Sequence, residues 1–196
     1  MHYNPYVEPP FFCKLTLNDG SVINIEDTVG NGLLTNEMTS AYSASCVSVE
    51  IGDLCTRIYE NTFNGWSITS LTIGNNVTSI GEIAFNTCNG LTSLIIPNSV
   101  QNIQYQCFYN CDGLKTLTIG NGITMIRDSS FCACSGLTRI TIEAETPPRL
   151  LFESDEIPFS RTNSCPIYVP SGSVDAYKTA EYWSTYADRI QAISTE

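Results

Sequence analysis

Residues 91–113 read LTSLIIPNSVQNIQYQCFYNCDG, and the same pattern returns in the blocks on either side of them. Residues 68–90 and 114–136 align with this stretch without a gap, so the chain repeats every 23 residues. The aligned positions carry leucine or isoleucine, valine, phenylalanine, cysteine and a closing glycine. A fixed period in this range indicates a solenoid, in which each repeat forms one coil.

The aligned positions define rows that we expect to face inward and to stack, because a single coil cannot bury its own apolar side chains. The rows are Leu71, Leu94, Leu117 and Ile140; Ile73, Ile96, Ile119 and Ile142; Val77, Val100 and Ile123; Ile80, Ile103 and Ile126; Phe85, Phe108 and Phe131; Cys88, Cys111 and Cys134. Residues 46–67 form an imperfect first repeat, which is typical of the end of a solenoid.

Each coil contains two predicted strands. Residues 91–96 alternate and are rich in β-branched side chains, which indicates a short strand. Residues 97–99 form a turn, as the Gly and Asn residues at 74–76 and 120–122 do in their coils. A second strand is predicted over residues 100–103, and one helical or 3₁₀ turn over residues 81–88.

The two ends differ in texture from the repeats. Residues 11–17 and 21–25 flank Asn18, Asp19 and Gly20, which is a strong hairpin signal. Residues 143–165 break the period. We then expect a strand at 167–170, a helix at 174–182 started by Ser171 or Ser173 and followed by Trp183, and a last strand or tail at 190–193. We therefore divide one structural domain into an N-terminal cap (1–45), repeats (46–142), and an irregular segment with a C-terminal cap (143–196).

Composition restricts the classes of partner. The net charge is −11, which argues against nucleic acid and anionic membranes because both need basic patches. No apolar run is long enough for a membrane span. Residues 1–10 show neither the basic region nor the apolar core of an export signal, so we expect either a cytoplasmic protein or the mature part of an exported one.

The nine cysteines are interpreted as buried thiols. Cys107 falls on the Ala84 position, Cys55 on the Val77 position and Cys46 on the Ile68 position, all of which we expect to face inward. Free cysteine behaves as a small apolar side chain in such places. Disulfides and a cysteine-only zinc site remain alternatives.

No catalytic constellation stands out, and we expect no enzyme activity, no metal and no cofactor. His2 is the only imidazole, so chemistry that needs a positioned histidine base lacks one. Glu82 and Asp128 share a column but are separated by Tyr105, and we interpret them as a solvated face. The acidic residues at 143–156 could hold a hard cation, although a solvated loop is the simpler interpretation.

Two surface features are candidate binding sites. On the first strand of each coil, the side chains that point away from the core are Ser70, Thr72, Ser93, Ile95, Thr116, Thr118, Arg139 and Thr141. Stacking them predicts a flat polar sheet with Ile95 exposed in its middle, and solenoids commonly bind partners on such surfaces. The second candidates are the aromatic residues Tyr59, Trp66, Tyr105 and Tyr109 on the irregular side.

The coil pattern Leu-x-x-Leu-x-Ile-Pro-x-x-Val-x-x-Ile-x-x-x-x-Phe-x-x-Cys resembles the BspA-like (Treponema pallidum-type) leucine-rich repeat. Residues 91–113 match it closely, and residues 80–85 carry its Ile-Gly-x-x-Ala-Phe signature. Later coils depart from it, since Gln104 and Arg127 replace the glycine. The segment 167–183 resembles the C-terminal end of such proteins from gut and oral Bacteroidetes.

The resemblance implies an α/β, β-rich fold: a right-handed leucine-rich-repeat solenoid of 23-residue coils with an N-terminal hairpin cap and a C-terminal strand-helix cap. It also implies a non-enzymatic protein-interaction module at the cell surface or outside the cell, with adhesion to host or matrix proteins. A structural spacer without a partner and a carbohydrate-binding module are the alternatives.

Overall fold

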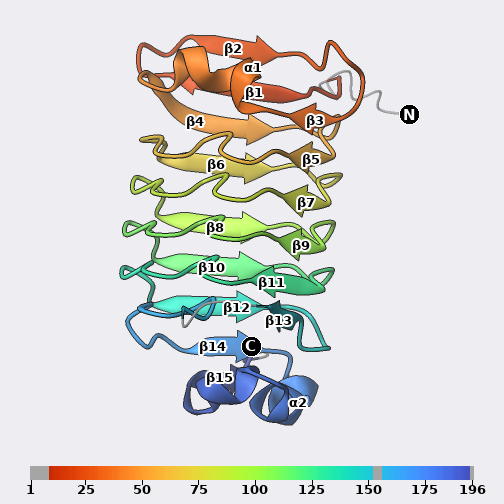
Figure 1. The fold of residues 1–196 in the computed structure, drawn as a ribbon, viewed down its shortest axis with the longest axis vertical. Helices are drawn as coiled ribbons and strands as arrows, with labels where there is room; N and C mark the ends of the chain where they lie inside the picture. Colours follow the sequence, from red (N-terminus) through yellow and green to blue (C-terminus); the bar gives the residue numbers. More distant parts are fainter. Residues whose placement is uncertain (1–8, 152–155, 195–196) are drawn as a thin grey trace, which may run out of the picture.

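The structure, a computed structural model, describes residues 9–151 and 156–194. Short strands lie one above another along its long axis, from the N-terminal end to the C-terminal end (Figure 1). Each central coil adds a longer strand to a first ladder and a shorter strand to a second ladder. This is a β-rich repeat fold with mostly parallel strands and few helices.

The longer strands form the first ladder. They are β4 (Cys46–Ile51), β6 (Ser70–Ile73), β8 (Ser93–Ile96), β10 (Thr116–Ile119), β12 (Arg139–Ile142), β14 (Ile167–Val169) and β15 (Ile190–Ala192). Strands β8, β10, β12, β14 and β15 make one parallel sheet, while β4 and β6 belong to another. Leu94 lies opposite Leu117, which lies opposite Ile140, so the rows of the sequence alignment are the paired positions of the sheet.

The shorter strands form an uninterrupted second ladder of six. They are β3 (Leu33–Leu34), β5 (Arg57–Ile58), β7 (Ser79–Ile80), β9 (Asn102–Ile103), β11 (Met125–Arg127) and β13 (Arg149–Leu151). Each strand contributes one fully buried aliphatic side chain at the same position, such as Ile80 and Ile103. The ladder begins at β3, in a segment where the sequence shows no repeat.

The first ladder is interrupted between β6 and β8. In the two coils that follow, the residue after the strand donates its N–H to the preceding coil: Gly120 to the Ile96 carbonyl and Glu143 to the Ile119 carbonyl, both at 2.9 Å. Pro97 occupies the equivalent position in its coil and has no N–H to donate. Among the described residues no strand pairing joins β6 to β8, and the sheet divides there.

The third side of each coil consists of turns, so the expected helical or 3₁₀ turn over residues 81–88 is wrong. Ile83 and Thr87 adopt left-handed φ values of 58° and 56°. Their N–H groups donate to the carbonyls of Tyr105 and Tyr109 in the next coil, at 3.0 and 2.8 Å. In a helix these N–H groups would donate to carbonyls of the same segment. Here they donate to carbonyls of the neighbouring coil instead.

The phenylalanine row forms a continuous stack through the core. Neighbouring rings lie 5.1 to 5.6 Å apart between centroids, and their planes are within 15° of parallel. The members are Phe63, Phe85, Phe108, Phe131 and Phe159, and all five are fully buried. The inward assignment of this row is confirmed, and Phe159 extends it into the segment where the sequence period is broken.

The N-terminal end begins with a hairpin of β1 (Cys13–Leu17) and β2 (Val22–Ile25), as the turn signal predicts. Gly20 has φ 86°, a conformation that costs glycine little. β1 also pairs antiparallel with β4, which joins the hairpin to the stack. A short helix α1 (Asn36–Thr39) and a 3₁₀ turn η1 (Ser40–Tyr42) follow β3.

The C-terminal end consists of η2 (Ser171–Ser173), α2 (Val174–Thr179), η3 (Trp183–Arg189) and β15, drawn in blue in Figure 1. The helix is shorter than expected because Ala180 is extended and Tyr182 has φ 64°. Ser173 precedes α2 but makes no side-chain capping bond. Trp183 is buried against Phe159 and donates its Nε1–H to the Pro148 carbonyl at 2.7 Å.

Candidate functional site

The outward side chains of the longer strands line one side of the stack. We call the set of Ser70, Thr72, Ser93, Ile95, Thr116, Thr118, Arg139 and Thr141 the strand face. All eight are exposed or partly exposed, and each alternates along its strand with inward residues. The division between β6 and β8 places Ser70 and Thr72 on one sheet and the other six on the next.

Ile95 is the single apolar member of the strand face, and it is 68% exposed. A groove of about 470 Å³ runs beside it over the division between β6 and β8. Its lining includes Leu71 and Pro97 from the two sides of the division. Leu71 is only partly buried, although Leu94 in the same row is buried, because the neighbouring strand is not paired there. The strand face therefore has an apolar centre within a polar surround.

Tyr168 extends the strand face toward the C-terminus. It lies on β14 opposite Thr141, and the guanidinium of Arg139 sits 3.9 Å from the centre of its ring. Arg139 also donates from Nε to the Oγ1 of Thr141 at 3.3 Å. The alternation of Ile167, Tyr168 and Val169 was the sequence signal for this outward position, but the broken period hid that β14 continues the ladder.

Of the four aromatic candidates on the irregular side, Trp66 is buried and does not reach the surface. It is only 3% exposed and meets Phe63 edge to face, with 5.0 Å between ring centroids. Trp66 stands three residues after Phe63, which is the inward position that Cys88 holds after Phe85. The row position therefore decides its burial.

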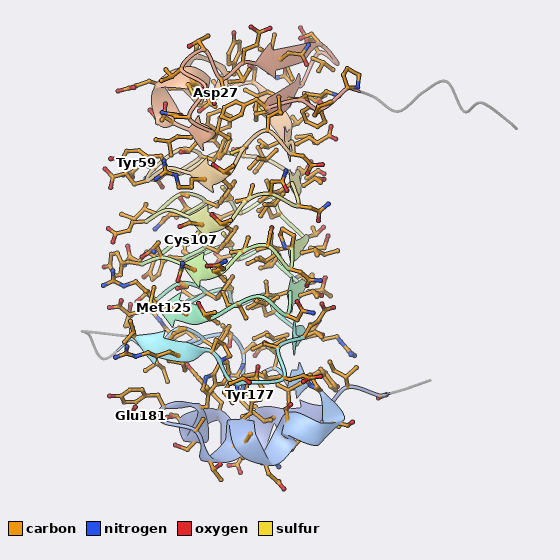
Figure 2. All side chains as sticks on the ribbon, turned by 90° about the vertical axis from the view of Figure 1, so that its right-hand side faces the viewer. Asp27, Tyr59, Cys107, Met125, Tyr177 and Glu181 are labelled. Atoms are coloured by element: carbon orange, nitrogen blue, oxygen red, sulfur yellow. The ribbon has the colours of Figure 1, made fainter. Side chains whose placement is uncertain are left out.

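The other three aromatic candidates do not form a common platform. Tyr59 is 50% exposed at the side of the stack (Figure 2), while Tyr105 and Tyr109 are partly buried two coils further on. The hydroxyl of Tyr109 accepts a hydrogen bond from Arg161 at 3.2 Å. Arg161 also pairs with Glu156.

All nine cysteines are buried with free thiols, which confirms their expected inward placement. Cys107, for example, lies inside the stack (Figure 2). Burial raises the pKa of Cys55 and of Cys88 to about 12. A nucleophilic cysteine needs the opposite shift, so these thiols contribute packing and not reactivity.

The acidic residues stay separate. Glu143 and Glu145 are exposed, and a carboxylate oxygen of Glu82 lies 3.7 Å from a guanidinium nitrogen of Arg127 two coils further on. Asp128 is buried, at 4% exposed, so the expectation of a solvated face is wrong for this residue. Glu153, Asp155 and His2 lie outside the described residues. Over residues 9–151 and 156–194, no group of three or more histidine, cysteine or acidic side chains is arranged to hold a metal ion.

Comparison with protein families gives a match over residues 40–171 to the BspA type leucine rich repeat region, with six copies of the repeat. The chain belongs to the BspA-type leucine-rich repeat family. BspA-type repeats are protein-interaction modules, in general non-enzymatic, and the proteins that carry them are typically surface-associated. No curated protein matches this chain. In the part that the structure describes, no helix is both long and apolar enough to cross a bilayer.

Proposed function

We propose that this BspA-type chain is a non-enzymatic interaction module that binds another protein through the strand face. The observation that carries the proposal is the exposed Ile95 beside the groove that Leu71 and Pro97 line. An apolar centre surrounded by hydroxyl-bearing side chains has the anatomy of a protein interface, with a hydrophobic core and a polar rim. The regular pairing of strands 23 residues apart supports the solenoid that presents this surface.

The proposed setting is the cell surface or the extracellular space, with adhesion to host or matrix proteins as the role. The typical location of BspA-type proteins supports this setting. The net charge of −11 and the shortage of lysine favour a protein partner over nucleic acid. Trp66 is buried and cannot stack on a sugar, which weakens the alternative of a carbohydrate-binding module.

Biolayer interferometry tests the proposal with immobilised fibronectin, fibrinogen and a glycan panel at physiological salt, with and without calcium. Saturable binding to a protein is expected. The variant Ile95→Lys with Thr118→Lys should lose this binding, because complex formation would bury two lysine ammonium groups against the apolar surface of the partner. The matched control is Gln101→Lys with Ser135→Lys, which adds the same charge away from the strand face. Absence of binding to every probe would favour the spacer alternative, and binding to glycans alone would favour the carbohydrate module.

A further inference from the structure

β2 is an open edge strand at the N-terminal end of the stack (Figure 1). Among the described residues it has one strand neighbour, β1. The N–H of Leu17 donates to the carbonyl of Ser21 at 2.9 Å, which makes these two residues a hydrogen-bonded pair. Bonded and non-bonded pairs alternate along an antiparallel ladder. The main-chain groups of Val22 and Asn24 therefore point away from β1, and we call these outward groups the β2 edge.

Apart from its short length of four residues, the β2 edge lacks the sequence features that usually protect an edge strand from pairing. Natural edge strands are blocked by charged side chains, proline or a bulge. The sequence of β2 is Val-Ile-Asn-Ile, its register with β1 has no irregularity, and Val22 is 54% exposed. An extended segment can add to such an edge through main-chain hydrogen bonds.

Carboxylates flank the β2 edge at both ends. Asp19 accepts hydrogen bonds from the N–H and the hydroxyl of Ser21, and these bonds lower its pKa. Asp27 accepts from the N–H groups of Gly32, Gly30 and Val29, which also lowers its pKa. Glu26 is exposed beside it. The edge is therefore an uncharged strand between ionised acids, and Figure 2 shows Asp27 at this end of the stack.

A hollow of about 540 Å³ adjoins the C-terminal end of β2. Its lining combines apolar side chains, among them Phe11, Ile25 and the half-exposed Leu54, with the charged Lys14, Glu26 and Asp27. Lys14 lies on this hollow with its amino group 4.0 Å from the centre of the Phe11 ring. A strand that pairs with β2 can place an apolar side chain in the hollow as it passes the edge.

A second copy of this chain fits the edge poorly. Antiparallel pairing of two β2 strands would bring Asp19 of one copy toward Asp27 of the other. Each copy also carries a net charge of −11. Like charges that face each other across an interface are unfavourable, so the charge pattern selects a different occupant.

We propose that the β2 edge docks an extended segment of another protein whose central residues are apolar or β-branched and whose flanks carry lysine or arginine. The main-chain groups of Val22 and Asn24 provide the pairing, and Asp19, Glu26 and Asp27 select the flanking charge. This site is separate from the strand face.

The test measures binding of a fluorescent peptide of alternating valine and threonine with two lysines at each end, using polarisation with the full chain. The same peptide with glutamate flanks should bind at least about tenfold more weakly, and added salt should weaken binding of the lysine form. Asn24→Pro removes one outward N–H without touching the bonds to β1, and should weaken binding about tenfold or more. Asn24→Thr keeps that N–H and is the matched control, with the melting temperature of each variant confirming the fold.

Equal affinity of the wild-type chain and Asn24→Pro would overturn the proposal, as would equal affinity for the two flank charges. Dimerisation that Asn24→Pro abolishes would assign the edge to a second copy instead. Ile95→Lys with Thr118→Lys should leave peptide binding unchanged, which separates this proposal from the function of the strand face.

Discussion

The Sγ of Cys111 donates a hydrogen bond to the main-chain carbonyl of Phe85, one coil earlier, at 3.3 Å. Cys88 and Cys134 make the same bond to the carbonyls of Phe63 and Phe108. The cysteine row therefore ties each coil to the preceding one beside the phenylalanine stack. This contact gives cysteine a role that alanine, of similar polarity and smaller size, cannot fill.

Cys111→Ala should lower the free energy of unfolding by about 1–2 kcal/mol, because it removes the bond and leaves a small cavity. Cys111→Ser should lose less of this interaction, since its hydroxyl can donate to the same carbonyl. Urea unfolding monitored by circular dichroism measures both. If Cys111→Ala is as stable as the wild-type chain, the hydrogen bond from the thiol does not contribute to stability.

Phe108→Ala should lower the free energy of unfolding by about 3–5 kcal/mol, since the side chain is fully buried between Phe85 and Phe131. Phe108→Leu keeps most of the volume and should cost less. The free energy of unfolding in urea tests the pair. A loss below about 1 kcal/mol in Phe108→Ala would contradict the inward stack.

Ile83→Asn should raise stability by about 1 kcal/mol. Ile83 is β-branched and holds a left-handed φ of 58°, which is costly for such a side chain, whereas asparagine tolerates it. Asn61 already occupies the equivalent position one coil earlier with φ 56°. Ile83→Val, which remains β-branched, should bring no gain. A destabilised Ile83→Asn would show that the apolar contacts of Ile83 outweigh its backbone strain.

Stability should fall as the pH rises above about 9. Burial raises the pKa of Cys55 and Cys88 from 9.0 to about 12, so the folded state keeps protons that the unfolded state releases. Their contribution is therefore complete below pH 9 and is lost progressively toward pH 12, at about 1.4 kcal/mol per pH unit for each thiol. Urea midpoints between pH 7 and 10.5 under reductant measure the slope. A flat profile would contradict the burial of these thiols.

The repeat positions could be predicted from the sequence because each coil repeats the same packing environment. The phenylalanine, isoleucine and cysteine rows follow from one alignment, and the structure buries all of them. The strand face follows from the same alternation. The positions that repeat in the sequence are therefore the positions that make the same packing contacts in each coil.

The remaining features depend on contacts between coils that periodicity does not encode. The turn geometry around Ile83 is set by carbonyls of the next coil, and β3 pairs with β5 without a recognisable repeat before it. The burial of Trp66 is hidden in the sequence because the first coil is degenerate, although Trp66 holds the position after Phe63 that Cys88 holds after Phe85. The place of Tyr168 beside the strand face does not follow from the period, because the insertion after β12 shifts β14 out of the 23-residue register.

The measurement that tests the strand face most directly is the affinity of Ile95→Lys with Thr118→Lys for a protein that the wild-type chain binds, beside Gln101→Lys with Ser135→Lys. The account predicts at least about a hundredfold loss of affinity for the first pair, and none for the second, with unchanged melting temperatures for both. Equal affinity of the first pair and the wild-type chain would contradict the assignment of the partner site to the strand face.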